Sequence, residues 1–337
     1  MESPSLHNVS RNRPFDDKKV LITDGVHPKL IEGFVALGFH YDYYPKITLD
    51  KVKAIIQDYD GIIINSKIIV DKAFLDKAVR LKFIGRLGSG MEIINQPYAR
   101  QKGVAVFSAP EGNCNAVAEH ALGMLLAFAN NFRKGDREVR QMIWEREANR
   151  GFEIMGKTVG IVGFGHTGSQ FAKKLSGMGV KVLAYDKYKS EGYALDYGFV
   201  RETTPEQIFE EADIVSLHLP LNPETKHLAN YDWMSKFKKS IVLINTSRGN
   251  VIPTADLIRG LEAGIIRGAC LDVFENEKPH TFSEAEKAVF NRLYEFENVI
   301  LTPHVAGWTV ESLERLAMVL LTKITNFLAE TQPFAEG

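Results

Sequence analysis

Three charged or titratable side chains each follow a short apolar run in the second half of the sequence: Arg248, Glu277 and His304. A short apolar run bounded by polar residues is typical of a buried strand in a parallel sheet. Ligands of open α/β sheets bind beyond the carboxyl ends of the strands. We therefore expect the three side chains to meet at one crevice.

Together these side chains suit the oxidation of an alcohol that lies next to a carboxylate. Removing the hydroxyl proton needs a base that titrates near neutral pH, and His304 is of that type. Glu277 could orient the imidazole and stabilise its charged form. Arg248 has a planar guanidinium that can bind carboxylate and carbonyl oxygens. Taken alone, each residue could have a purely structural role in its loop, but the combination favours catalysis.

Such a reaction also needs a hydride carrier, and a glycine motif indicates where one would bind. Gly163, Gly165 and Gly168 stand between the apolar run Thr158–Val162 and an amphipathic helix pattern, and a second apolar run ends at Asp186. Strand, glycine turn, helix, strand and acid is the order of a dinucleotide-binding unit. The helix N-terminus would offer N–H groups and partial positive charge to a pyrophosphate. The alternative is a structural glycine turn in an unrelated α/β protein.

The residue at the end of the second strand favours NAD as the cofactor. The carboxylate of Asp186 can accept hydrogen bonds from both ribose hydroxyls, and it would repel the 2′-phosphate of NADP. Lys187 and Lys189 stand close by in the sequence and could soften that repulsion. We therefore expect NAD, with NADP left open as a second cofactor.

The composition indicates two domains and no nucleic-acid or membrane partner. The 337 residues suffice for two cores, and 41 basic residues nearly balance 42 acidic ones. The longest apolar stretch, residues 121–129, is too short to span a bilayer. The polar N-terminus, an expected loose tail, lacks the apolar region of a signal peptide. Cys114 and Cys270 are typical of free thiols in a cytoplasmic protein, and the histidines show no metal-ligand spacing, so we expect no metal.

Apolar strands and amphipathic helices alternate along the chain. The expected strands lie at residues 19–23, 61–64, 83–84, 104–107, 158–162, 214–219, 241–245, 268–273 and 299–301. The expected helices lie at residues 28–37, 52–57, 71–78, 115–132, 254–263 and 310–328. This alternation predicts parallel sheets with helices on both faces. We predict two Rossmann-like doubly wound α/β domains: an NAD-binding domain, residues 118–307, inserted into a flavodoxin-like substrate domain, residues 1–117 and 308–337.

Seven segments resemble the D-isomer-specific 2-hydroxyacid dehydrogenase family: RLGSGMEIIN, APEGNCNAVAEH, GIVGFGHTG, SLHLPLNPETKHL, INTSRGNVI, GACLDVFENE and ILTPHVAGWT. The resemblance covers roughly residues 20–328, and these motifs in this order are highly specific. It implies that Arg248, Glu277 and His304 match the family's catalytic residues and that the substrate is a small 2-hydroxy or 2-keto acid. Family members are usually dimers with the helix after Asn115 at the interface, so we expect a homodimer.

The motifs and the resemblance together indicate the binding residues. The expected cofactor contacts are Gly163, Gly165, His166, Thr167, Gly168, Asp186, Pro220, Thr225, Thr246 and Asp272. The resemblance implies that Asp272 contacts the nicotinamide carboxamide and that the backbone of residues 87–90 cradles the substrate carboxylate. The expected substrate contacts are Lys67, Leu87, Gly88, Ser89, Gly90, Arg248 and Trp308. Trp308 could overhang the substrate pocket or pack at the start of the last helix.

Departures from the family pattern leave the substrate open. His166 stands where the family often has an arginine, which weakens one expected phosphate contact. Members that oxidise D-3-phosphoglycerate tend to have arginines where this sequence has Asn65 and Lys67. Residues 252–255 replace a common acidic pair, which we interpret as altered helix capping.

The sequence therefore predicts an NAD-dependent D-2-hydroxyacid dehydrogenase. Oxidation of D-3-phosphoglycerate is one candidate reaction, and reduction of glyoxylate or hydroxypyruvate is the alternative. A different class would be a non-catalytic, NAD-sensing scaffold like a transcriptional corepressor. The presence of the arginine, glutamate and histidine argues for catalysis. The sequence stops soon after Leu328, so we expect no C-terminal regulatory domain.

Overall fold

The computed structural model describes residues 14–331 and consists of two compact units. The first unit combines the chain up to Asn113 with the chain from Leu313 onward, and the second is Cys114–Ser312. One α/β unit is thus inserted into another, which is the predicted fold class. The chain passes between the units a few residues from the predicted boundaries, after 113 and after 312 instead of after 117 and 307. The expected loose tail begins in residues 1–13, which lie outside the described residues.

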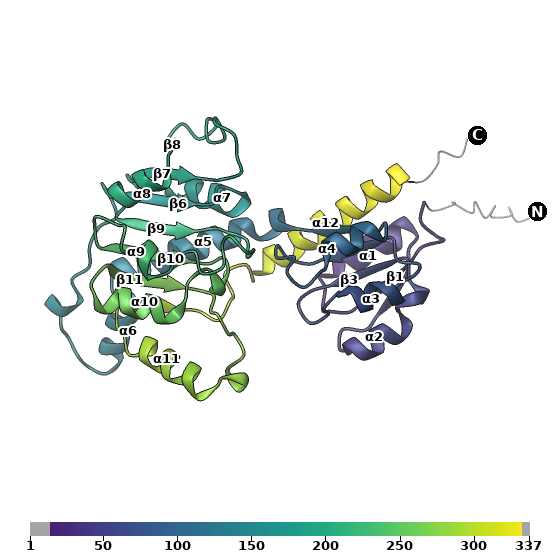
Figure 1. Ribbon diagram of the computed structural model, residues 1–337, viewed down its shortest axis with the longest axis horizontal. Helices are drawn as coiled ribbons and strands as arrows, with labels where there is room; N and C mark the ends of the chain where they lie inside the picture. Colours follow the sequence, from purple (N-terminus) through teal and green to yellow (C-terminus); the bar gives the residue numbers. More distant parts are fainter. Residues whose placement is uncertain (1–13, 332–337) are drawn as a thin grey trace, which may run out of the picture. The chain divides into compact units, whose positions relative to one another are not determined.

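The first unit is built on a five-stranded parallel sheet (Figure 1). Its strands are β1 (Lys19–Ile22), β2 (His40–Tyr43), β3 (Gly61–Ile64), β4 (Phe83–Arg86) and β5 (Ala105–Ser108). They lie in the order β2-β1-β3-β4-β5. This is the flavodoxin-like order, so the predicted fold class of this unit is confirmed.

Five α-helices and a short 3₁₀-helix accompany this sheet. They are α1 (Pro28–Leu37), α2 (Leu49–Ile55), η1 (Ile56–Asp58), α3 (Lys72–Lys77), α4 (Gln96–Gln101) and α12 (Val310–Thr331). Local sequence sets the ends of α1, because His27 caps its N-terminus and Gly38 ends it in the left-handed conformation, with φ 95°. The last helix, α12, supplies Leu316, Leu320 and Ile324 to the same core cluster as residues of β1 and α1.

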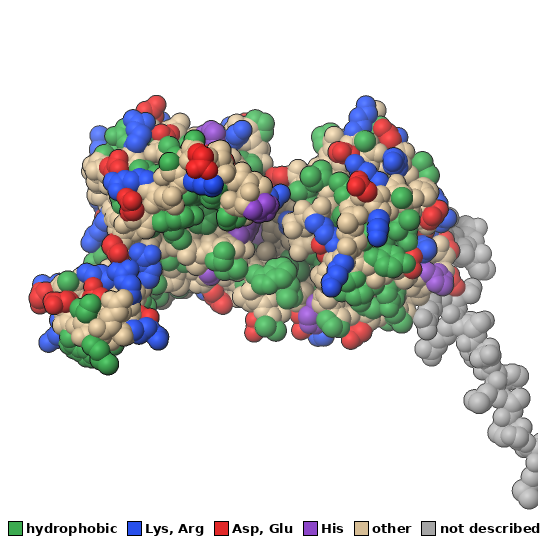
Figure 2. Space-filling model, turned by 90° about the horizontal axis from the view of Figure 1, so that it is seen from below, with side chains coloured by type: hydrophobic (Ala, Val, Ile, Leu, Met, Phe, Trp, Pro, Cys, Tyr) green, Lys and Arg blue, Asp and Glu red, His purple; other side chains and the backbone are tan. Residues whose placement is uncertain are grey.

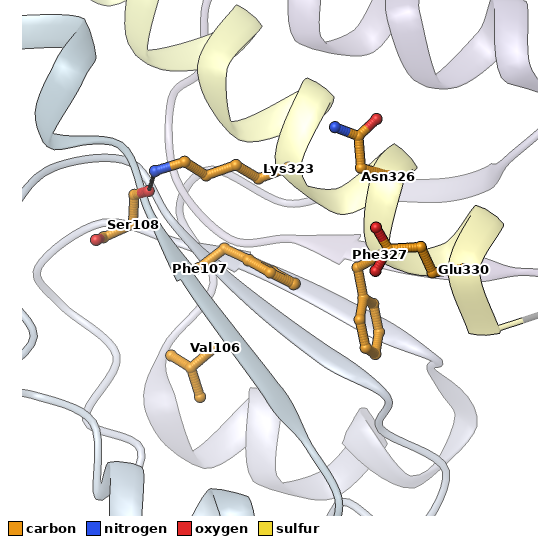
Figure 3. A pocket seen from close by; sticks show the side chains of 7 residues that line it. All are labelled: Val106, Phe107, Ser108, Lys323, Asn326, Phe327 and Glu330. Atoms are coloured by element: carbon orange, nitrogen blue, oxygen red, sulfur yellow. Dashed lines mark hydrogen bonds between the residues drawn. The ribbon is translucent and has the colours of Figure 1, made fainter.

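The chain leaves and re-enters the first unit at neighbouring places. Arg315 Nε in α12 donates a hydrogen bond to the carbonyl oxygen of Gly112 at 3.1 Å. Further along α12, Lys323 Nζ donates to the carbonyl oxygen of Ser108 at 2.9 Å and pairs with Glu111 at 2.8 Å. Figure 3 shows Lys323 reaching Ser108 beside a shallow pocket between β5 and α12. None of the predicted site residues lines this pocket.

The second unit is built on a seven-stranded parallel sheet. Its strands are β6 (Thr158–Val162), β7 (Lys181–Tyr185), β8 (Val200–Glu202), β9 (Ile214–Leu217), β10 (Ile241–Asn245), β11 (Ile266–Leu271) and β12 (Val299–Leu301). They lie in the order β12-β11-β10-β9-β6-β7-β8 (Figure 1). The strand order therefore reverses between β6 and β9, as in a Rossmann sheet, and such a switch point is where open α/β sheets bind ligands.

Helices cover both faces of this sheet. They are α5 (Pro110–Ala129), α6 (Phe132–Arg140), η2 (Glu147–Asn149), α7 (His166–Leu175), α8 (Pro205–Glu211), α9 (Tyr231–Met234), η3 (Gly249–Val251), α10 (Thr254–Glu262), η4 (Pro279–Thr281) and α11 (Glu284–Tyr294). Side chains of α5 and α7 pack in one core cluster, and those of α8, α10 and α11 in another. The predicted helix at residues 115–132 is shifted: α5 runs from Pro110 to Ala129, and a separate α6 follows Asn131, whose φ of 54° breaks the helix.

Residues 14–331 contain no membrane-spanning helix and no cluster of metal-ligand side chains. No helix in this range is both long and apolar enough to cross a membrane. No three His, Cys, Asp or Glu side chains in this range gather in a way that could hold a metal ion.

Candidate active site

The glycine turn after β6 lies against the end of β9, at the switch point of the sheet. Gly163 has φ 91°, and a Cβ atom there would lie 2.3 Å from the carbonyl oxygen of His218. The turn leads into α7, which begins with His166 and Thr167. A Cβ atom on Gly165, the residue before α7, would meet nothing within 4 Å. The N-terminus of α7 therefore faces open space, which fits the pyrophosphate of a dinucleotide.

Asp186 is fixed beside this turn. Its Oδ2 accepts the backbone N–H of Phe164 at 2.8 Å, and its Oδ1 accepts the backbone N–H of Tyr188 at 3.0 Å. A carboxylate can accept about four hydrogen bonds, so capacity remains for ribose hydroxyls. The structure thus places the predicted ribose-binding group next to the glycine motif.

The two lysines after Asp186 make contacts of their own. Lys187 Nζ pairs with Glu224 at 2.7 Å. Lys189 Nζ lies 5.7 Å from the ring centroid of Phe164. Because the charge of Lys187 already has a carboxylate partner, Lys187 is poorly suited to offset the repulsion between Asp186 and a 2′-phosphate.

The other predicted cofactor residues lie in the loops after β9 and β10. Thr225 Oγ1 donates to the carbonyl oxygen of Pro220 at 2.6 Å, which closes the loop after β9. Thr246 directly follows β10, and its buried hydroxyl oxygen has no hydrogen-bond partner within the described protein. A buried polar atom without a partner is costly. Thr246 therefore fits a cofactor that would provide the missing hydrogen bond.

The predicted acid–base pair is formed at the ends of β11 and β12. His304 Nδ1 lies 2.7 Å from Glu277 Oε2, and Glu277 Oε1 accepts the backbone N–H of Phe274 at 3.2 Å. His304 has φ 55°, in the left-handed region. That conformation costs a non-glycine residue about 1–2 kcal/mol, and strain of this kind clusters at functional sites.

The contact between the two side chains favours their charged forms. The hydrogen bond with Glu277 raises the pKa of His304, and the charges of Glu277 and Asp272 add to this, while burial and Arg248 oppose it. Burial acts to raise the pKa of Glu277, but its hydrogen bond and charge interaction with His304 lower it below the ordinary value. The imidazole is therefore held as a proton donor to a higher pH than a solvated histidine.

Arg248 lies in the loop after β10, which packs against the loop that carries Glu277. The close approach occurs at Gly249, where a Cβ atom would lie 1.9 Å from the carbonyl carbon of Phe274. Asn245, the last residue of β10, donates to the carbonyl oxygen of Arg248 at 3.0 Å. Sequence reasoning did not identify Asn245 as part of the site, although an asparagine that ends a strand commonly bonds to the turn after it.

Asp272 is fully buried at the end of β11. Its carboxylate accepts the backbone N–H groups of Val305 and Ala306, at 2.9 and 2.8 Å. These bonds tie it to the loop that carries His304. Its contact with a nicotinamide carboxamide stays a prediction.

Glu275 lies near Glu277 in the sequence but serves another element. Its Oε2 accepts the backbone N–H of Thr254 at 2.6 Å, at the start of α10. The residue before α10, Pro253, provides no side-chain cap. Glu275 thus caps α10 from a neighbouring loop, in agreement with the altered capping that we inferred for residues 252–255.

The predicted substrate loop, residues 87–90, belongs to the first unit and follows β4. Gly88 has φ 153°, and a Cβ atom there would lie 1.9 Å from Arg86 Nη1. Leu87 is buried, and Ser89 Oγ donates to Asn113 Oδ1 at 2.9 Å. The loop with Gly88 and Gly90 therefore offers chiefly backbone groups.

Two predicted substrate contacts are long side chains. Lys67, in the first unit, donates to the carbonyl oxygen of Pro45 at 2.7 Å and lies 3.7 Å from Asp24 Oδ1. Trp308, in the second unit, is 59% exposed. This exposure disfavours the alternative in which Trp308 packs at the start of the last helix, and its substrate contact stays a prediction.

Comparisons with known proteins identify the family to which this chain is similar. Residues 122–306 match the model of the NAD-binding domain of D-isomer-specific 2-hydroxyacid dehydrogenases. The chain is 33% identical over 275 residues to a hydroxypyruvate reductase of Thermotoga maritima, covering 82% of this chain and 87% of that one. It is similar to the crystal structure of an Aquifex aeolicus D-lactate dehydrogenase complexed with NAD and lactic acid, with TM-score 0.80, 28% identity and coverage of 93% and 96%.

Longer relatives also match. A D-3-phosphoglycerate dehydrogenase of Synechocystis is 35% identical over 316 residues, which cover 94% of this chain and 55% of that relative. The chain therefore spans about half the length of the phosphoglycerate dehydrogenases that it resembles.

Proposed function

Because this chain belongs to the family of D-isomer-specific 2-hydroxyacid dehydrogenases, we propose that it uses NAD to interconvert a small D-2-hydroxy acid and its 2-keto acid. The contact between His304 and Glu277 carries this proposal, because it prepares an imidazole for proton transfer. That contact lies at the strand ends of a cofactor-binding unit, close to Arg248. A non-catalytic scaffold would not need this arrangement.

NAD would lie across the switch point of the second unit and supply or accept the hydride. The N-terminus of α7 would bind the pyrophosphate, Asp186 the ribose, and Thr246 would gain a hydrogen-bond partner. Asp186 would repel a 2′-phosphate, and Lys187 is held by Glu224. We therefore propose a preference for NAD over NADP.

The side chains of the second unit would bind the substrate and move one proton. Arg248 binds the carboxylate and the carbonyl oxygen through its planar fork. In the reducing direction, His304 donates its proton to the oxygen that becomes the hydroxyl group. In the oxidising direction, the neutral imidazole accepts that proton. Glu277 orients the ring and stabilises its charged form.

The substrate that we favour is a small keto acid without phosphate, such as glyoxylate or hydroxypyruvate. Lys67 is the basic side chain expected near a substrate phosphate, and Pro45 and Asp24 already engage its ammonium. Asn65 lacks the positive charge of the arginine common in phosphoglycerate-oxidising members. D-3-phosphoglycerate is the second candidate, because several relatives carry the name of its dehydrogenase.

We also propose a cytoplasmic homodimer. Large apolar side chains are exposed on α6 and the segment after it: Phe132 is 61%, Met142 92% and Trp144 74% exposed. Figure 2 shows hydrophobic side chains in green at the left, where Figure 1 places α6. Such a patch is typical of a protein interface. The buried Cys270 thiol forms no disulfide, which suits the cytoplasm.

An assay of keto-acid reduction tests the proposal. Oxidation of NADH and of NADPH would be followed with glyoxylate, hydroxypyruvate, pyruvate and phosphohydroxypyruvate. We expect turnover of at least one keto acid with NADH preferred, and a loss of about 10²–10⁴-fold in the His304→Ala variant. Binding of NADH without turnover of any keto acid would favour the scaffold, and equal efficiency with NADPH would exclude the proposed role of Asp186.

A further inference from the structure

A buried hydrogen-bond network centred on Asp272 joins the loop that carries His304 to other elements of the second unit. Asp272, at the end of β11, accepts a hydrogen bond at its Oδ1 from the hydroxyl of Thr302 at 2.6 Å. The same carboxylate holds the N–H groups of Val305 and Ala306, and the carbonyl oxygen of Asp272 accepts the N–H of His304 at 2.8 Å. One buried residue therefore holds the chain on both sides of His304.

A second element, α5, reaches this network through His120. The Nε2 atom of His120 lies 3.0 Å from Thr302 Oγ1 and 3.6 Å from Asp272 Oδ1. A threonine hydroxyl has a single proton, and the 2.6 Å distance assigns that proton to the bond with Asp272. Thr302 Oγ1 must then accept its hydrogen bond from His120, which requires a proton on Nε2.

His304 is a residue whose conformation has to be maintained by its surroundings. Its φ of 55° is unfavourable for any side chain larger than glycine. A general acid also has to keep its ring within hydrogen-bond reach of the reacting oxygen. Groups that hold the loop 302–306 therefore determine how often His304 is in the productive position.

We propose that His120 and Thr302 are positioning residues for His304 and act through Asp272. The proposal rests on the proposed function, because it assumes that His304 transfers the proton. The charged groups that act on the imidazole are Glu277 and Asp272, from the strand β11 and its loop, and Arg248, from the loop after β10. Neither His120 nor Thr302 is expected to contact substrate or cofactor, so their loss should lower kcat and leave KM and NADH affinity nearly unchanged.

Two pairs of variants test the hydrogen bonds. Thr302→Val keeps the shape of the side chain and removes the hydroxyl, and we expect kcat to fall about tenfold. Thr302→Ser keeps the hydroxyl and should retain most of kcat. His120→Leu removes the donor from α5, whereas His120→Gln can donate to Thr302 from its amide. We expect kcat to fall in His120→Leu and to be largely retained in His120→Gln. With two independent pairs, the test does not depend on the folding of a single variant.

A double-mutant cycle separates positioning from a general structural role. If Thr302 acts through His304, Thr302→Val should have no further effect on kcat in a His304→Ala background. An equal fall of kcat in both backgrounds would overturn the proposal, as would a Thr302→Ser variant as slow as Thr302→Val. If His304→Ala alone left kcat unchanged, the proposed function itself would fail, which is a different result. NADH binding by fluorescence should agree within about twofold across these variants.

Discussion

The two units present their predicted site residues in different ways. In the second unit the functional groups are side chains that bind one another at strand ends, as His304 does with Glu277. In the first unit residues 87–90 offer mainly backbone, and Lys67 is already engaged by Pro45 and Asp24. In the proposed function, proton transfer and substrate binding depend on side chains of the second unit. Substrate specificity would depend more on the backbone conformation of residues 87–90 in the first unit.

The sharpest way to test this contrast is to alter Arg248, the cation of the second unit that we propose binds the substrate. Arg248→Lys keeps the positive charge but loses the bidentate geometry, so we expect kcat/KM to fall about 10²-fold or more. NADH binding, measured by fluorescence, should change little. Arg259→Lys is the control, because Arg259 is an exposed residue of α10 that pairs with Asp256. Wild-type turnover in Arg248→Lys would remove Arg248 from the site.

A smaller effect is expected from the residue that tunes the acid–base group. Glu277 raises the pKa of His304, so Glu277→Gln should lower that pKa. Reduction needs protonated His304 and declines as the pH rises through this pKa, so its limb should move to lower pH. Oxidation needs the neutral form, and its rising limb should move in the same direction. The measurement is kcat/KM against pH in both directions.

Glu275→Gln is the matched control for this titration. Glu275 caps α10 and does not contact His304, so its removal should leave both limbs in place. A Glu277→Gln profile that coincides with the wild type would show that Glu277 is not the partner that sets the titration.

The smallest change in kcat/KM should come from a substitution in the first unit. Lys67→Met removes a charge that Asp24 already offsets, so we expect kcat/KM for glyoxylate to change by less than about threefold. Lys53→Met is the control, because Lys53 forms a comparable surface pair with Asp71 at 3.7 Å. A tenfold fall in kcat/KM for phosphohydroxypyruvate alone would show that Lys67 does bind a substrate phosphate. The first unit would then also contribute a side chain to substrate binding.

The strands with continuous apolar runs were the elements that the sequence predicted most accurately. The runs at 61–64, 158–162 and 241–245 are central strands with the predicted bounds, because a central parallel strand is buried on both faces and reads as a continuous apolar run. The run at 299–301 also has its predicted bounds, as the edge strand β12. Within the seven-stranded sheet of the second unit, the parallel strands lie side by side and their carboxyl ends form one edge. For that reason Arg248, Glu277 and His304 could be selected together from the sequence.

Elements with weak apolar patterns were not predicted. β2 (His40–Tyr43) is an edge strand with largely exposed residues, and α6 has no buried residue. For α11 a signal was present, since Ser283 and Glu286 form a capping box. The contact of His120 with Thr302 joins residues 182 positions apart, and no local pattern encodes such a pairing.

The inserted topology also bears on the order in which the protein can fold during synthesis. Leu316, Leu320 and Ile324 of α12 are fully or almost fully buried in the core of the first unit. The ribosome makes them only after the whole of the second unit, which is one continuous stretch of chain. Domains usually fold in the order of their synthesis. Here the unit that is begun first cannot complete its core until the second has emerged, so we expect the cofactor-binding unit to fold first on the nascent chain.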